Sequence, residues 1–189
     1  MKKYDEEAAG VLQQWTEKEV RTVIGASSSC SVPEDNEYHP RGPHRWFPEA
    51  VADISAIIAM RRMSEVWKER PPYSSWRSCA PAIRHRADEM VLAAGLLPGI
   101  TLAQWFNENE PLLQKDPTML ERTTVVAVAL LPIFEQEPDC WQAMDWLDDD
   151  TRGTFADYLK DWHARVPEKH RPFVREVAGK FGIEIESRV

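Results

Sequence analysis

TTVVAVALLPIF, residues 123–134, is the longest strongly apolar run in the chain, and it contains no charged residue. Asp116-Pro117 precedes the run and Glu137-Pro138 follows it, so residues typical of turns lie on both sides. We therefore predict one buried helix here, which Asp116-Pro117 caps and which Pro132 ends or kinks in its last turn. The run has 12 residues, whereas a membrane-spanning helix needs about 20 apolar residues.

The composition is that of a folded globular protein. The chain has 189 residues, of which 43% are hydrophobic and 29% are charged, and this length suits one domain. We predict a single helical domain over residues 1–189, because helical periodicity recurs along the chain and period-two alternation does not.

Cysteine use and the N-terminal sequence both bear on location. Cys30, Cys79 and Cys140 are odd in number and widely spaced, which argues against a disulfide framework and favours a reducing compartment. The sequence MKKYDEEAAG at residues 1–10 has no apolar core and does not resemble a secretory signal. We therefore expect a soluble, cytoplasmic protein that does not associate with a membrane.

Helical periodicity predicts further helices on both sides of the central run. In chain order, the predicted helices cover residues 4–24, 48–68, 78–94, a short segment from 101, 123–134, 139–147, 151–165 and 171–181. Pro48 suits the first turn of the second helix, and Thr101 with Gln104 predicts a capping box. Residues 26–47 are rich in serine and proline and predict a long irregular loop, and residues 183–189 predict a short extension or an edge strand.

These elements predict an all-α fold, an orthogonal bundle of about 6–9 helices with little or no sheet. An alternative is HEAT-like packing of helical hairpins, because LLP occurs at 96–98 and again at 130–132. The offset of 34 residues is typical of helical-repeat proteins. Two copies of a three-residue string are weak support for a repeat, so the orthogonal bundle is the favoured prediction.

Charge is distributed unevenly along the chain. The net charge is −8, with −4 in residues 1–40, +5 in residues 41–86 and −9 in residues 87–189. Aromatic residues alternate with arginines in the basic segment, a mixture that suits a protein interface or stacking on nucleic-acid bases. The candidate partner-binding residues are Arg41, Arg45, Trp46, Arg61, Arg62, Trp67, Arg70, Tyr73, Trp76 and Arg77. The competing interpretation is that this segment pairs with the acidic C-terminal part and that its tryptophans belong to the core.

The sequence contains no recognised catalytic or metal-binding motif. Cys30, His39 and His44 lack the paired thiolates of a structural zinc site, so we expect no metal and no cofactor. The acidic run at residues 148–150 is interpreted as a cap of the helix predicted from Thr151. His163 and His170 are likewise interpreted as residues near helix ends, without a role in a functional site.

Three hypotheses on function remain. The favoured one is a non-catalytic, acidic helical module that binds another protein, as an adaptor, a regulatory subunit or an immunity- or inhibitor-type protein does. In that case charge reversal at Arg61 and Arg62 abolishes binding without lowering the melting temperature. The alternatives are a binder of nucleic acid or another polyanion through residues 41–86, and a thiol- or metal-dependent enzyme that uses Cys79 or the loop histidines.

Overall fold

The computed structural model describes residues 42–136, 138–147 and 153–186, and every regular element in these ranges is a helix. The prediction of an all-α fold is therefore confirmed. Within the same ranges, no helix is both long enough and apolar enough to cross a membrane. The helix predicted at residues 4–24 and most of the predicted loop, up to residue 41, lie outside the described residues.

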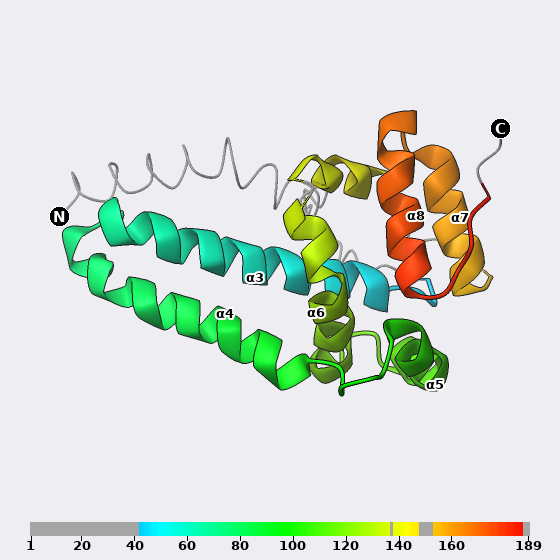
Figure 1. The fold of residues 1–189 in the computed structure, drawn as a ribbon, viewed down its shortest axis with the longest axis horizontal. Coiled ribbons are helices and arrows are strands. Elements are labelled where there is room, and N and C mark those ends of the chain that lie inside the picture. The colour runs from blue at the N-terminus through cyan, green and yellow to red at the C-terminus, as the bar shows by residue number, and fades with distance from the viewer. Residues whose placement is uncertain (1–41, 137, 148–152, 187–189) are drawn as a thin grey trace, which may run out of the picture.

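A long antiparallel helical hairpin forms one side of the molecule (Figure 1). It consists of α3 (Trp46–Glu69), the 3₁₀-helix η2 (Ser74–Cys79) and α4 (Ala80–Ala94). The buried residues of α4 are three alanines at intervals of seven, Ala80, Ala87 and Ala94. Small side chains at this spacing let the α4 backbone approach α3 closely along one seam. The rest of α4 is partly or fully exposed.

The structure corrects the predicted start of α3. The loop was predicted to reach residue 47, with Pro48 opening the helix, but α3 begins at Trp46. Trp46 and Phe47 are both fully buried, and burying two large aromatic side chains stabilises the additional first turn more than the loop composition disfavours it.

The apolar run lies in α6 (Leu120–Gln136), which crosses the hairpin and packs against α3, α4, α5 and α8 (Figure 1). The prediction that residues 123–134 form one buried helix is confirmed. The predicted cap is wrong, because Asp116 ends the preceding helix: its N–H donates to the carbonyl of Leu112 at 3.0 Å.

Pro132 was predicted to end or kink the last turn of α6, and of these two alternatives the structure contradicts the first. The helix continues to Gln136 with Pro132 inside it. Pro132 is exposed, whereas Ile133 and Phe134 directly after it are buried. The burial of these two side chains stabilises the last turn against the loss of one backbone hydrogen bond.

The helix α5 (Leu102–Lys115) lies beside the lower end of α6 in Figure 1. Its predicted capping box is confirmed: Gln104 N–H donates to Thr101 Oγ1 at 3.2 Å, and Thr101 N–H donates to Gln104 Oε1 at 2.9 Å. The helix is longer than the predicted short segment and continues through Pro111. The buried Leu113 lies in the added turns and ties them to the core.

At the other end of the molecule, α7 and α8 form an antiparallel pair (Figure 1). The elements here are η3 (Pro138–Trp146), α7 (Phe155–Arg165), η4 (Glu168–His170) and α8 (Arg171–Lys180). The indole N–H of Trp162 donates to the carbonyl of Ala143 at 2.8 Å and joins α7 to η3. The helix predicted at 139–147 is present in the tighter 3₁₀ form.

The predicted start of α7 at Thr151 is also wrong. The helix starts at Phe155, and its cap is a reciprocal pair of hydrogen bonds between Thr154 and Asp157. The acidic run at residues 148–150, which was interpreted as the cap, lies outside the described residues. Hydrogen bonds from the Thr154 hydroxyl and N–H lower the pKa of Asp157, as expected of a carboxylate in a capping box.

The C-terminal segment leaves α8 through Gly182, which has a φ of 72°, a conformation that glycine adopts without steric cost. Residues 183–186 form no strand, so of the two predicted alternatives the short extension is correct and the edge strand is wrong for this part of the tail. Ile183 and Ile185 instead pack against the core. Residues 187–189 lie outside the described ranges.

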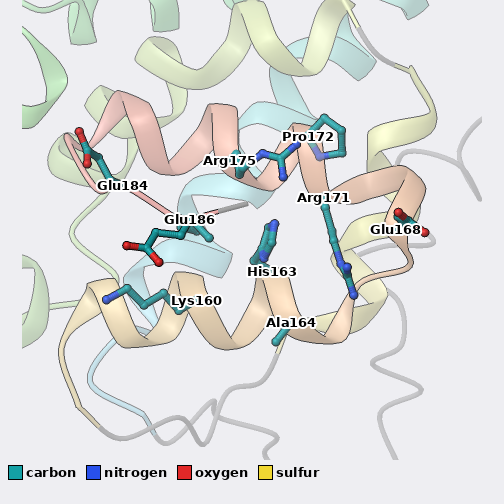
Figure 2. A pocket seen from close by; sticks show the side chains of 10 residues that line it. Lys160, His163, Ala164, Glu168, Arg171, Pro172, Arg175, Glu184 and Glu186 are labelled. Carbon is teal, nitrogen blue, oxygen red and sulfur yellow. The ribbon is translucent and has the colours of Figure 1, made fainter. Parts of the chain in front are cut away.

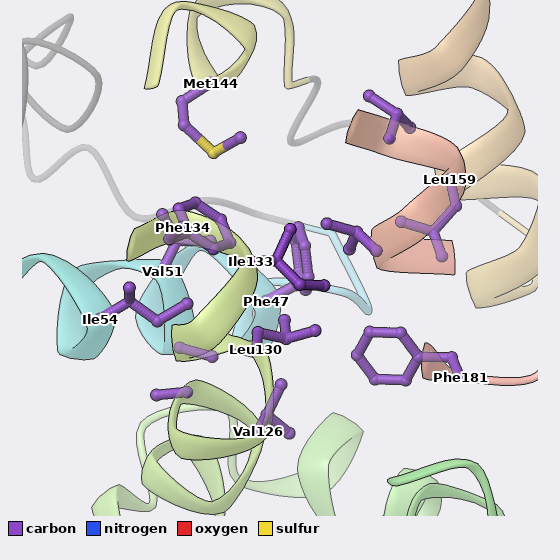
Figure 3. Packing of buried hydrophobic residues seen from close by; sticks show 14 of the residues in the cluster. Phe47, Val51, Ile54, Val126, Leu130, Ile133, Phe134, Met144, Leu159 and Phe181 are labelled. Atoms are coloured by element: carbon purple, nitrogen blue, oxygen red, sulfur yellow. The ribbon is translucent and has the colours of Figure 1, made fainter. Parts of the chain in front are cut away.

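The core joins helices that are far apart in the sequence (Figure 3). Phe155 of α7 is at its aromatic centre, with ring centroids 4.6 Å from Trp46, 5.2 Å from Phe106 and 4.9 Å from Phe181. Phe47 extends the same cluster at 5.5 Å. Because these rings come from α3, α5, α7 and the end of α8, the cluster fixes the relative positions of all four segments.

Candidate partner-binding surface

The ten predicted binding residues do not form one surface. Arg41 lies outside the described residues. Arg45 and Trp46 lie at the start of α3, where Trp46 is fully buried and the Arg45 guanidinium lies 3.7 Å from Glu49. Trp46 is therefore part of the aromatic core, and its ring is not accessible to a partner.

Arg61 and Arg62 are neighbours in α3 with different surroundings. The Arg61 guanidinium lies 2.6 Å from Glu135 of α6 and 3.7 Å from Asp88 of α4, so it joins three helices. Arg62 is more exposed and lies 3.5 Å from Glu65 on its own helix. A charge reversal at Arg61 is therefore expected to weaken the fold, which makes that substitution unsuitable as a test of binding alone.

The remaining five candidates come together at the turn of the hairpin, which we call the hairpin tip and define as residues 66–79. Trp76 packs its ring against Trp67 at a centroid distance of 5.3 Å and against Tyr73 at 4.9 Å. Trp76 nevertheless keeps 39% of its surface exposed. The double proline at 71–72 allows this arrangement, because it breaks α3 and brings η2 back over the end of that helix.

The hairpin tip is basic in an acidic chain. It contains Lys68, Arg70 and Arg77 and a single acid, Glu69, for a net charge of +2, so the rest of the chain carries −10. Arg77 donates a hydrogen bond to the backbone carbonyl of Glu69 at 3.2 Å. Among the described residues, Lys68 and Arg70 have no acidic partner within ion-pair distance, and Arg70 is exposed.

The thiol and metal hypotheses gain no geometric support. Cys79 is exposed at the hairpin tip and Cys140 is buried, both as free thiols, whereas Cys30 lies outside the described residues. His85, the histidine nearest to Cys79 in the sequence, has its Nε2 atom 3.2 Å from Glu89. Within the described ranges, no group of three His, Cys, Asp or Glu side chains is arranged to hold a metal ion.

One partly buried carboxylate, that of Asp53, has a clear structural role. Asp53 of α3 accepts hydrogen bonds from the hydroxyls of Thr123 and Thr124 of α6, at 2.9 and 3.1 Å. Burial raises the pKa of Asp53, and the two hydroxyl donors partly offset that shift. Asp53 is therefore interpreted as a polar connection between two packed helices, with no neighbouring group that suggests catalysis.

A pocket that the sequence did not reveal lies between α7, η4, α8 and the C-terminal segment (Figure 2). Its volume is about 860 Å³. The charged side chains that line it are Lys160, His163, Glu168, Arg171, Arg175, Glu184 and Glu186. In the sequence, the one indication of this pocket is His163, whose position there indicates an ordinary residue near a helix end.

Comparison with known proteins adds no assignment: no family model, no curated protein and no solved structure matches this chain. The class that the described residues define is an all-α protein with a projecting basic, aromatic hairpin tip. Any statement on function therefore depends on the geometry of the chain itself.

Proposed function

We propose that this protein is a non-catalytic helical module that binds an acidic partner protein through the hairpin tip, and that it acts in the cytoplasm. The observation that carries the proposal is the exposed side chain of Trp76, whose ring packs against Trp67 and Tyr73. Arg70 and Arg77 belong to the same hairpin tip. Tryptophan and arginine are the residues most enriched at energetically dominant interface positions.

The packing of the tip favours a protein partner. Trp67 and Tyr73 cover part of the Trp76 ring, so the indole is held in place before a partner arrives and loses little side-chain entropy on binding. The basic side chains around it attract an acidic surface and increase the association rate. The exposed free thiol of Cys79 fits a reducing compartment such as the cytoplasm.

Cys79 lies within the tip and permits a direct test. A photoactivatable crosslinker is attached to Cys79 in a Cys30→Ser background, and the protein is illuminated in lysate of its native host. The matched control carries the crosslinker at an exposed site on α8, in a Cys79→Ser, Lys180→Cys variant. We expect one predominant acidic protein to be captured at Cys79 and not at the control site.

Two substitutions then test the residues that carry the proposal. Trp76→Ala and Arg70→Glu are each expected to reduce capture at least tenfold, because either residue, if central to the interface, contributes more than about 1.4 kcal/mol. Neither is expected to change the melting temperature appreciably, since both side chains are exposed. Capture that persists in both variants contradicts the proposal. Salt-sensitive recovery of nucleic acid supports the polyanion alternative instead.

A further inference from the structure

The pocket between α7 and α8 has an unusual distribution of charge. Arg171 and Arg175 are separated by one helical turn on α8 and both line the pocket. Like charges at this spacing repel each other and destabilise a helix. Among the described residues, neither arginine has a carboxylate within ion-pair distance, and the buried Nε of Arg171 has no hydrogen-bond partner.

The facing helix brings further positive charge. Lys160 and His163 are separated by three residues on α7 and line the opposite wall. Figure 2 shows His163 at the middle of the pocket, pointing toward α8 and the Arg175 guanidinium. The Nε2 atom of His163 is buried and has no hydrogen-bond partner among the described residues. Three cations and an unpartnered imidazole nitrogen therefore line a single space.

Acidic residues are present but lie at the margins of the pocket. Glu168 belongs to η4, and Glu184 and Glu186 belong to the C-terminal segment. In Figure 2 these carboxylates lie on the outer sides of the pocket, with Lys160 beside Glu186, whereas His163 lies between Arg175 and Arg171. The middle of the pocket is thus positive, and its rim is mixed in charge.

We propose that this pocket binds a small dianion, a phosphate monoester or a dicarboxylate, which Arg171 and Arg175 hold, beside which His163 takes up a proton, and to which Lys160 adds positive charge from the rim. Guanidinium groups match carboxylate and phosphate oxygens in paired hydrogen bonds, and an ammonium group adds a point charge. The volume of about 860 Å³ is within the range of small-molecule sites. The pocket lies at the opposite end of the molecule from the hairpin tip (Figure 1), so this site does not depend on the proposed function.

The protonation of His163 follows from its neighbours. Burial and the charges of Arg175 and Arg171 lower the pKa of His163, so the empty site holds a neutral imidazole at pH 7. A bound dianion offsets the arginine charges and favours the protonated imidazole. By thermodynamic linkage, a protonated His163 must then favour the dianion to the same extent. Affinity is therefore expected to increase as the pH falls.

The test is a calorimetric and NMR titration of the full chain with defined anions. Inorganic phosphate and succinate represent the two kinds of dianion, and acetate represents a monoanion. We expect at least one dianion to bind about tenfold or more tightly than acetate, because it engages more than one charge-assisted donor. The stronger of the two dianions identifies the ligand class. Equal binding of acetate, or no saturable binding of either dianion, overturns the proposal.

Variants assign the binding to these residues. Arg175→Gln is expected to weaken dianion binding about tenfold or more, whereas Lys180→Gln, on the same helix and outside the pocket, leaves it unchanged. Arg171→Lys keeps the charge and removes the paired donors, so it is expected to weaken binding by less than Arg175→Gln. An unchanged affinity in folded Arg175→Gln contradicts the proposal.

The pH dependence of binding is measured with sulfate, because sulfate stays doubly charged over the whole pH range of the experiment. Between about pH 7.5 and about pH 5.5, we expect sulfate affinity to rise for the wild type and to stay nearly constant for His163→Gln. The His163 ring signals are expected to titrate at higher pH when sulfate is present. A wild-type affinity that does not rise contradicts the role given to His163 and, with it, the proposal.

Discussion

Two clusters of aromatic side chains in this protein differ in how they are assembled. In the core, Phe155 contacts rings from α3, α5 and the end of α8. At the hairpin tip, Trp67, Tyr73 and Trp76 lie within ten residues of one another, and the Trp76 ring packs against the rings of the other two. The core cluster therefore requires the whole fold, whereas the tip cluster forms from one local turn.

Exposure separates the two clusters more sharply than composition does. Trp46 is fully buried and Trp76 is 39% exposed, although both lie in the basic, aromatic segment 41–86. The first turns of α3 therefore belong to the core, as the competing interpretation of this segment predicted. The partner-surface interpretation applies only to the hairpin tip, where Trp76 is accessible, and it remains a proposal.

The largest expected effect is the loss of a core ring. Phe155→Ala removes the side chain that six other aromatic rings contact among the described residues, and it is expected to lower the free energy of unfolding by about 3–5 kcal/mol. Trp76→Ala removes a larger side chain at the tip, yet it is expected to cost less than about 1 kcal/mol, because much of that ring is already in water. Chemical denaturation of both variants measures the difference.

The milder Phe155→Leu keeps that comparison measurable if the alanine variant does not fold. It is expected to retain the fold and to remain more destabilised than Trp76→Ala. Equal losses of stability in Phe155→Leu and Trp76→Ala would show that the two clusters do not differ in the way described here.

Sequence patterns predicted the elements whose cause is local. The apolar composition of residues 123–134 was enough to identify the buried part of α6. The capping box of α5 needs only Thr101 and Gln104, three residues apart. The same pattern is present at Thr154 and Asp157, but the acidic run before it was taken as the cap. Reciprocal side-chain bonds to the backbone are the more specific signal.

Features that depend on distant residues could not be predicted in this way. Trp46 was assigned to a loop because the residues before it are polar and rich in proline, and its burial is caused by Phe155, more than 100 residues later. The α7–α8 pocket combines two helices, a 3₁₀ turn and the C-terminal segment. No spacing in the sequence indicates that these four elements face one another.

A smaller effect on stability is expected from substitutions of Arg61 and Arg62, two neighbours in α3 that contact different parts of the fold. Arg61→Gln removes contacts to Asp88 and Glu135, at 3.7 and 2.6 Å, and is expected to lower the free energy of unfolding by about 1 kcal/mol. Arg62→Gln removes an exposed contact to Glu65 within the same helix, and the loss of that contact is expected to cost about 0.3 kcal/mol.

A double-mutant cycle of Arg61 with Glu135 shows whether this contact causes the loss. The coupling energy is expected to account for most of the effect of Arg61→Gln, since Glu135 is the nearer carboxylate. The measurement also decides which arginine is suitable for studying the partner. If Arg61→Gln and Arg62→Gln are equally stable, the contacts of Arg61 to α4 and α6 do not support the hairpin.

The smallest expected effect concerns pH and the junction between α3 and α7. His44 Nε2 donates to the carbonyl of Gly153 at 3.1 Å, while the buried Nδ1 atom has no partner among the described residues. Burial lowers the pKa of His44 from 6.5, and the Gly153 carbonyl with the carboxylates of Glu110 and Asp157 partly offsets that shift. A second proton on the ring would leave a buried N–H without an acceptor.

The sign of the pH effect follows from the lowered pKa. The unfolded chain binds a proton at His44 at higher pH than the folded chain does, so the stability contributed by His44 is complete above about pH 6.5 and is lost as the pH falls toward the folded pKa. His44→Gln keeps a donor for the Gly153 carbonyl and does not titrate. The stability advantage of the wild type over this variant is therefore expected to shrink between about pH 7.5 and about pH 5.5. If this advantage instead grows as the pH falls, the folded state favours the protonated imidazole. The surroundings of His44 would then be more polar than its packing against the rings of Phe155 and Tyr158 indicates.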